Sequence, residues 1–207
     1  MTYLIFDLDG TILNTETAIL KSLQHVLAEE QLHYELHELT FALGVPGKDT
    51  LRTIGITDID RVHPKWSQLV LQYSNEVDIF DTLRDILNDL HKRRVPMSIV
   101  TSKMRQEIKD EFEPFNIQHY FEEIISADDT TKHKPNPEPL LLCLQHLNIA
   151  KEDAIYIGDS IYDLQCAHAA GVRFALAYWG AKKTVGFEDA DFILRTPSEI
   201  YTLLEHA

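Results

Sequence analysis

Short apolar runs alternate with segments of helical periodicity along most of this chain. Runs that are apolar almost throughout are typical of strands buried on both faces of a parallel sheet. Six such runs predict strands, over residues 3–6, 96–100, 123–126, 154–157, 172–177 and 191–194. Because helical segments separate these runs from residue 81 onward, the pattern predicts an α/β fold with a doubly wound parallel sheet and a Rossmann-like core.

Residues 14–81 follow a different pattern, because apolar side chains recur there at helical spacing and no convincing strand is found. One apolar stripe begins at Ile19, and a second runs from Val62 to Val77, with a short predicted helix over 48–54 between them. We therefore expect a helical bundle inserted into the core. The expected division is a core of residues 1–13 and 82–207 and a helical insert of residues 14–81.

Capping residues predict where several helices begin and end. Asp81 is expected to cap a helix with one apolar face, and Ser102 to cap a helix over 103–112. A further helix over 160–170 is expected to end at Gly171, since glycine readily adopts the left-handed conformation found at such ends.

The composition fits a packed globule and disfavours several partners. Of the 207 residues, 44% are hydrophobic, and the net charge is −14 at pH 7. This charge disfavours a nucleic-acid partner, because a phosphate backbone is bound by clustered lysine and arginine. No apolar run approaches the ~20 residues of a membrane span, so no membrane partner is expected. The first residues do not resemble a signal peptide, which predicts a soluble cytoplasmic protein.

Two cysteines and a pair of histidines are weaker candidates for chemistry. Cys143 and Cys166 fall among apolar residues in predicted helices and share no metal-ligand spacing. We expect them to be reduced core thiols, as in a reducing compartment. His33 and His37 lie four residues apart and could bind zinc from one helix, but no third ligand is evident. The sequence assigns no role to these histidines and specifies no oligomeric state.

Polar residues stand at the ends of four predicted strands. They are, in chain order, Asp7, Asp9, Thr101, Ser102, Lys134, Asp159 and Asp163. The carboxyl ends of parallel strands meet at one edge of a sheet, where proteins of this architecture bind their ligands. We therefore expect these side chains to converge on one crevice.

Four aspartates in one crevice would repel one another. Two like charges ~4 Å apart repel by roughly 4 kcal/mol at an effective dielectric constant of about 20. Either some of the carboxylates are protonated, or a cation lies among them. All candidate ligands are hard oxygen atoms, which favours magnesium over zinc or copper. Beside them Lys134, Thr101 and the Ser102 backbone N–H could bind a phosphate, which is the equipment for phosphoryl transfer through an aspartyl phosphate.

Four segments carry a family resemblance, in the order in which they occur along the chain. They are Asp7-Leu8-Asp9-Gly10-Thr11, Val100-Thr101-Ser102, Lys134-Pro135-Asn136-Pro137 and Gly158-Asp159-Ser160 with Asp163. Together they resemble the four motifs of the haloacid dehalogenase superfamily of phosphohydrolases. The helical insert resembles that family's first-type cap, as in phosphoglycolate phosphatase and beta-phosphoglucomutase.

The resemblance implies a role for each catalytic residue. Asp7 would be the nucleophile, and Asp9 would protonate the leaving oxygen and later deprotonate the attacking water. Thr101 and Ser102 would hold phosphoryl oxygens, while Lys134 would stabilise the charge on Asp7 and on the phosphate.

The resemblance also implies a magnesium site and a closing cap. Asp7, the backbone carbonyl of Asp9, and Asp159 would be the metal ligands, with Asp163 completing the site behind them. A small phosphorylated metabolite would be the substrate, and the cap would close over it and exclude water.

The insert departs from the family's sugar-phosphate mutases at two positions. Those enzymes carry a histidine four residues after a threonine in the first cap helix, whereas here Thr15 is followed by Ile19. They carry an arginine in the cap loop, where this chain has Gly47 and then Lys48. Simple hydrolysis is therefore favoured over a mutase, and a non-catalytic phosphate-binding module is the remaining alternative. Thr15, Glu16 and the loop from Gly44 to Thr50, which includes Lys48, are the expected substrate contacts. Phosphoglycolate, pyrophosphate, sugar phosphates and nucleotides all stay open.

Overall fold

A six-stranded parallel sheet forms the centre of the computed structural model, which describes residues 2–181 and 185–206. The strands are β1 (Tyr3–Phe6), β4 (Met97–Val100), β5 (Ile124–Ile125), β6 (Ala154–Gly158), β7 (Arg173–Ala177) and β8 (Phe192–Leu194). Their order is β5-β4-β1-β6-β7-β8, and every neighbouring pair is parallel. The six predicted strands and the doubly wound, Rossmann-like arrangement are thus confirmed.

Strand β1 lies between β4 and β6, and its register decides what the sheet edge carries. Phe6 is paired with Ile99 of β4 and with Ile157 of β6. Because the three strands run in the same direction, the residues that follow these partners emerge at the same level. The register therefore brings Asp7 and the segments that follow β4 and β6 to one edge.

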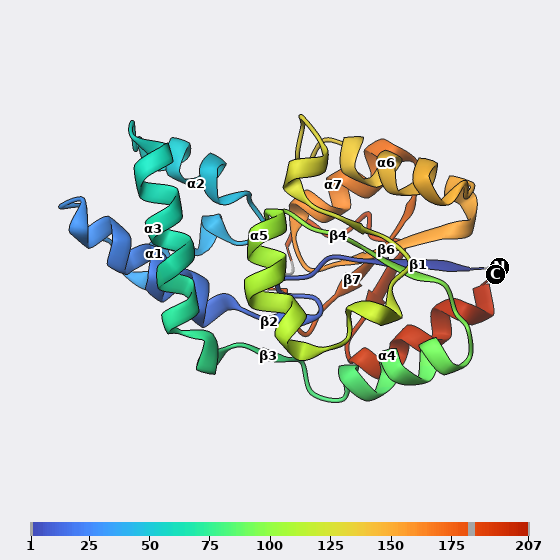
Figure 1. Cartoon of the computed structure of the whole chain (residues 1–207). Helices are drawn as coiled ribbons and strands as arrows, with labels where there is room; N and C mark the ends of the chain where they lie inside the picture. The colour runs from blue at the N-terminus through green and yellow to red at the C-terminus, as the bar shows by residue number, and fades with distance from the viewer. Residues whose placement is uncertain (1, 182–184, 207) are drawn as a thin grey trace.

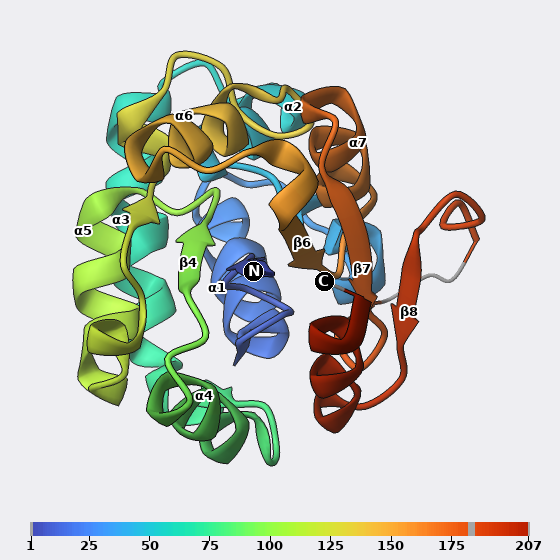
Figure 2. The ribbon, with the colours of Figure 1, turned by 90° about the vertical axis from the view of Figure 1, so that its right-hand side faces the viewer.

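Helices cover both faces of the sheet (Figure 2). On one face lie α4 (Leu83–Lys92) and a 3₁₀ helix over Pro197–His206, and on the other lie α6 (Glu138–Leu147) and α7 (Ile161–Ala170). Side chains alternate along a strand, so Phe6 packs into the core under α4 while Ile5 packs into the core under α6 and α7. Both cores are closed to solvent, which leaves the strand ends as the accessible part of the sheet.

The helical segment, residues 14–81, lies beside the sheet and holds an apolar cluster of its own (Figure 1). Its helices are α1 (Glu16–Glu29), α2 (Gly47–Ile54) and α3 (Ile59–Gln72), with a 3₁₀ helix over Leu36–Ala42. The chain enters it through β2 (Leu13–Asn14) and leaves it through β3 (Asp78–Ile79), and these two strands pair antiparallel. The expectation of no strand in this stretch was therefore wrong at its two ends, because strands of two residues show no periodicity.

Two of the three predicted helix ends differ from the structure. Helix α4 begins after Thr82, whose φ is 67°, so Asp81 is not its cap. The helix predicted over 103–112 begins only at Arg105, so Ser102 does not cap it either. The third prediction is confirmed, since α7 ends at Gly171 with a φ of 73°.

The weaker candidates behave as ordinary structural residues. Cys143 and Cys166 are buried free thiols of the core under α6 and α7. His37 lies in the 3₁₀ helix and His33 precedes it, so helical spacing does not bring the two together. Within residues 2–181 and 185–206, no helix combines the length and the apolar character that a membrane span requires.

Candidate active site

A buried ion pair stands at the centre of the strand-end edge. Asp7, directly after β1, is 2% exposed, and its Oδ1 lies 2.8 Å from Nζ of Lys134. The same nitrogen lies 2.7 Å from Oδ1 of Asp163. The sequence prediction that strand ends would bring these side chains together is in keeping with this geometry, although the motif residues are far apart in the chain.

Asp163 and Tyr156 hold the lysine in place. Oδ2 of Asp163 accepts hydrogen bonds from the Ser160 backbone N–H, at 3.0 Å, and from the Ser160 hydroxyl, at 2.6 Å. The hydroxyl of Tyr156 lies 3.1 Å from Lys134 Nζ and 2.9 Å from the Val100 carbonyl oxygen. Sequence reasoning missed Tyr156. The available signal was a tyrosine in an otherwise apolar strand, since a buried hydroxyl needs a partner.

Burial and mutual charge shift the ionisation of this group. Burial raises the pKa of Asp7 to about 7, although Lys134 opposes the shift. Burial also raises the pKa of Asp159 well above its usual range, and Asp163 and Asp7 add to the effect. Burial alone would lower the pKa of Lys134, but Asp163 and Asp7 raise it, so the lysine stays charged. One cation therefore stands among several carboxylates that are costly to ionise.

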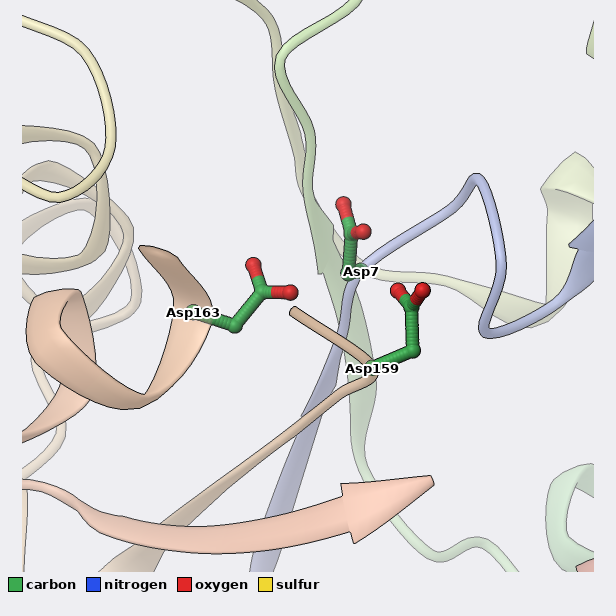
Figure 3. A group of neighbouring side chains, drawn as sticks. All are labelled: Asp7, Asp159 and Asp163. Atoms are coloured by element: carbon green, nitrogen blue, oxygen red, sulfur yellow. The ribbon is translucent and has the colours of Figure 1, made fainter. Parts of the chain in front are cut away.

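Three of these carboxylates are turned toward one another (Figure 3). Asp7, Asp159 and Asp163 each offer one oxygen, and the three atoms lie within 4.8 Å of one another. Asp163 already accepts from Lys134 and Ser160, whereas Asp159 accepts one long hydrogen bond, 3.3 Å from the Thr11 hydroxyl. Asp7 and Asp159 therefore have oxygens to spare, and this all-oxygen donor set fits a hard divalent cation.

Gly10 makes the approach to Asp159 possible. Its φ is 77°, and a Cβ on this residue would stand 2.2 Å from Oδ2 of Asp159. Any side chain here would push the carboxylate away. The glycine of the first motif is thus required by a close contact as well as by the turn.

The residues after β4 lie beside this group. Thr101 is buried, and its Oγ1 accepts a hydrogen bond from the Lys103 backbone N–H at 3.2 Å. The Ser102 hydroxyl donates to the Gly44 carbonyl oxygen at 3.2 Å, which joins the sheet edge to the helical segment. This bond explains why Ser102 does not cap the following helix.

A cavity lies between the sheet edge and the helical segment, and we call it the inner cavity. From the core it is lined by Asp7, Asp9, Ser102, Lys103, Glu107 and Glu111. From the helical segment it is lined by Ile19, Gly47, Trp66 and Ser67, among others. Of the predicted motif residues Asp7, Asp9 and Ser102 line this cavity, and Gly44 and Gly47 of the predicted contact loop line it from the other side.

The predicted contacts of the helical segment are only partly brought to the site. Thr15 is buried and lines a smaller cavity with Asp9 and Asp159. Lys48 lies instead in an outer groove between the helical segment and the core, with its Nζ 4.0 Å from Oδ1 of Asp60. Lys48 therefore does not line the inner cavity beside Asp7.

A second buried ion pair was missed by sequence reasoning. Nζ of Lys103 lies 2.6 Å from Oε2 of Glu111 and 3.3 Å from Oδ1 of Asp9. Burial raises the pKa of Glu111 despite Lys103, and the two carboxylates, with Asp9 first, raise the pKa of Lys103 despite its burial. Glu111 belongs to a π-helix, Ile108–Phe112, which directly follows α5 (Arg105–Glu107). Such wide turns often occur at functional sites.

Glu107 joins the core to the helical segment. Its Oε1 accepts a hydrogen bond from the Ser67 hydroxyl at 2.9 Å and lies 3.6 Å from Nε2 of His63. Its Oε2 accepts from the Met104 backbone N–H at 2.8 Å. Both oxygens are therefore fixed, one from each side of the inner cavity.

The arrangement at the edge of the sheet, a buried aspartate beside a lysine and two further aspartates, comes from the four motifs noted in the sequence. The sequence profile of the haloacid dehalogenase-like hydrolases matches residues 4–177, and the chain belongs to this family. The resemblance noted from the motifs, and the expectation of an enzyme, are thereby confirmed.

Individual relatives agree with this assignment. Pyrophosphatase PpaX of Oceanobacillus iheyensis is 31% identical over 204 residues, which cover 97% of this chain and 95% of that protein. Pyrophosphatase PpaX of a Bacillus thuringiensis strain is 28% identical over 204 residues, covering 97% of this chain and 94% of that protein.

Solved structures share the fold. A Lactobacillus plantarum protein, provisionally named a phosphoglycolate phosphatase, superimposes with a TM-score of 0.90 at 28% identity, covering 98% of this chain and 100% of that chain. CbbY of Rhodobacter sphaeroides, in a complex with xylulose-1,5-bisphosphate, superimposes with a TM-score of 0.83 at 18% identity, covering 96% of each chain. At that identity the likeness to CbbY concerns the fold alone.

Proposed function

We propose that this protein is a magnesium-dependent phosphatase that hydrolyses a small phosphorylated metabolite through an aspartyl-phosphate intermediate. The proposal is carried by the buried contact of Asp7 with Lys134, beside Asp159 and Asp163, at one edge of the sheet. Membership of a hydrolase family with relatives named as pyrophosphatases supports it.

In the proposed reaction Asp7 is the nucleophile. Lys134 holds Oδ1 of Asp7, which leaves Oδ2 to attack the phosphorus atom. The bond from phosphorus to the leaving oxygen breaks, and Asp9 gives its proton to that oxygen. Asp9 then takes a proton from a water molecule that attacks the phosphorus atom, which releases inorganic phosphate and restores the Asp7 carboxylate.

The surrounding residues would bind the phosphoryl group and the metal ion. Lys134, Thr101 and Ser102 would contact its oxygens, because a charged amine, a hydroxyl and a backbone N–H all favour an anion. The proposed ligands of Mg²⁺ are Asp7, the backbone carbonyl of Asp9, and Asp159, with Asp163 behind them. When bound, the ion supplies charge neutralisation at the phosphoryl oxygens.

We further propose that residues 14–81 act as a cap that closes over the substrate. The hydrogen bonds from Ser102 to Gly44 and from Ser67 to Glu107, which join this segment to the core, support a closed arrangement. Thr15 is a candidate substrate contact from the cap, and Lys48 would reach the substrate only after moving away from Asp60.

The two free thiols are in keeping with a cytoplasmic location.

Hydrolysis is preferred over a mutase reaction on the same scaffold. Ile19 places an apolar side chain in the inner cavity, where the mutases of this family carry a histidine. Gly47 also lines the cavity, and a Cβ there would stand 2.7 Å from Nε2 of His63. The arginine that the mutases carry at this place would not fit without displacing that ring.

Release of inorganic phosphate from an aryl phosphate, with Mg²⁺ and with chelator, tests the proposal. Asp7→Asn should reduce turnover by at least about 10³-fold while leaving the circular-dichroism spectrum unchanged. Asp85→Asn, on the distant helix α4, is the matched control and should retain activity. Turnover that persists in Asp7→Asn, or that is indifferent to chelator, would contradict the proposal.

A further inference from the structure

We propose that the inner cavity selects a leaving group that is uncharged or positively charged and donates hydrogen bonds, such as an alcohol bearing hydroxyl or ammonium groups. A leaving group that carries a second acidic group is disfavoured. This inference rests on the proposed phosphatase function and concerns the substrate class. The relatives are named as pyrophosphatases, and the leaving group of pyrophosphate is itself a phosphate. The inference therefore predicts a different preferred substrate for this chain.

The side of the cavity that receives the leaving group is fixed by Asp9. If Asp9 protonates the leaving oxygen, the leaving group lies next to Asp9 and away from Lys134. The charged residues that line this side are Lys103, Glu107 and Glu111. Lys134, the cation that faces the phosphoryl group, is engaged by Asp7 and Asp163 and lies outside this lining.

The charge on this side is negative. Within residues 2–181 and 185–206, Lys103 is the only cation that lines the cavity. Its charge is already balanced by Glu111, at 2.6 Å, while Asp9, at 3.3 Å, holds the proton that it gives to the leaving oxygen in the proposed reaction. Glu107 accepts hydrogen bonds from Ser67 and Met104, and no lysine or arginine of the described residues donates to it. Burial lowers the pKa of the adjacent His63, which keeps that ring neutral near pH 7. A second phosphate or a carboxylate would therefore meet like charges.

Three side-chain hydrogen-bond donors of the cavity wall are committed elsewhere. The Trp66 indole N–H donates to the Ser22 hydroxyl at 3.0 Å, and the Ser67 hydroxyl donates to Glu107 at 2.9 Å. The Ser102 hydroxyl donates to the Gly44 carbonyl oxygen at 3.2 Å. The side chains of the wall thus offer acceptors in excess of free donors, and a site built in this way rejects a ligand that cannot supply the donors.

Matched substrates test the inference directly. We expect kcat/KM with Mg²⁺ to be at least tenfold higher for glycerol 1-phosphate and O-phosphoethanolamine than for pyrophosphate and 2-phosphoglycolate. Equal or better turnover of pyrophosphate or 2-phosphoglycolate would overturn the inference.

Variants locate the selectivity in the two glutamates. Glu111→Gln and Glu107→Gln each remove one negative charge and should narrow the ratio of kcat/KM between glycerol 1-phosphate and pyrophosphate at least threefold. Asp110→Asn is the matched control, because Asp110 lies on the same π-helix but is exposed and does not line the inner cavity. An unchanged ratio in both glutamine variants, or an equal change in Asp110→Asn, would overturn the inference. Two variants are used because loss of the Lys103 partner could unfold Glu111→Gln, which a melting curve detects.

An aryl phosphate separates this inference from the proposed function. Magnesium-dependent turnover of phenyl phosphate that is lost in Asp7→Asn, combined with a preference for pyrophosphate, would overturn the leaving-group inference and leave the phosphatase standing. No Asp7-dependent turnover of any substrate would overturn both.

Discussion

The two sides of the proposed active site, one for the phosphoryl group and one for the leaving group, are built in different ways. On the phosphoryl side, Asp7 and Asp159 each follow a strand of the sheet, and their positions are set by strand register. On the leaving-group side, Glu107 and Glu111 come from consecutive helical turns, and Ser67 comes from the helical segment. The first arrangement needs only a correctly paired sheet, whereas the second needs two separately packed parts of the chain to meet.

This difference separates reaction chemistry from substrate choice. The phosphoryl side is a closed set of ionic contacts whose members, such as Lys134, are buried on all sides. The leaving-group side includes hydrogen bonds that join the core to the helical segment, from Ser67 and from Ser102. Substitutions on the phosphoryl side should therefore change the free energy of unfolding and turnover together. Those on the leaving-group side should mainly change substrate selectivity.

The largest effect is expected from Lys134→Met, which removes the cation of the phosphoryl side. The change leaves Asp7 and Asp163 buried without their cation, which typically costs about 3–5 kcal/mol of the free energy of unfolding. Urea unfolding measures this loss. Lys132→Met, two residues earlier and exposed, should stay within about 0.5 kcal/mol of the parent. A loss below about 1 kcal/mol for Lys134→Met would contradict the burial of the ion pair.

Magnesium binding should raise the free energy of unfolding through the phosphoryl side, and a substitution on the leaving-group side should not change this gain. At a hundred times its dissociation constant, a ligand that binds only the folded state adds about 2.7 kcal/mol. Thermal unfolding with Mg²⁺ and with chelator should show this gain in the parent and in Glu107→Gln. Asp159→Asn should not show it. An equal gain in Asp159→Asn would mean that the ion binds elsewhere.

Gly47→Ala should disturb the contact between the two sides. The new Cβ would stand 2.7 Å from Nε2 of His63 and 3.2 Å from Cζ3 of Trp66, so the histidine ring has to move. Overpacking of this kind typically costs about 1–3 kcal/mol, and we expect the lower end because a single ring can shift. A urea titration measures the cost, and Lys48→Ala, one residue further on, is the control. A cost equal to that of Lys48→Ala would show that the ring has room.

The smallest expected effect is a pH dependence that arises from His63. Burial lowers the pKa of this ring below the ordinary value of 6.5, so the unfolded chain binds the proton more readily than the folded protein does. Its contribution to stability is fully present above the ordinary pKa and is lost as the pH falls through the folded value. His63→Gln should flatten the profile of the unfolding free energy between about pH 5 and about pH 7. An unchanged slope would show that other groups determine it.

The sequence predicted the phosphoryl side because its information is local. Asp7 and the segment from Gly158 to Asp163 follow apolar runs that could only be buried strands, and parallel strands bring such ends to one edge. The same reasoning could not predict Tyr156 as a partner of Lys134, because that contact joins two strands and a loop.

The leaving-group side escaped prediction for a physical reason. A helical pattern read at 3.6 residues per turn does not show a π-turn, so the face on which Glu111 lies could not be assigned. The two capping predictions were wrong for a similar reason, because distant packing overrides a local capping preference. Thr82, with a positive φ, precedes α4 in place of Asp81, and the Ser102 hydroxyl donates to Gly44.

The pairing of β2 with β3 has a consequence for how the enzyme would admit its substrate. Leu13 is paired with Ile79 and Asn14 with Asp78, so the two chain connections between the core and the helical segment are tied to each other. A rotation at one connection has to be matched at the other. If residues 14–81 act as the proposed cap, opening would be restricted to a swing about a single hinge axis, and each closure would return Ser67 to the same place beside Glu107.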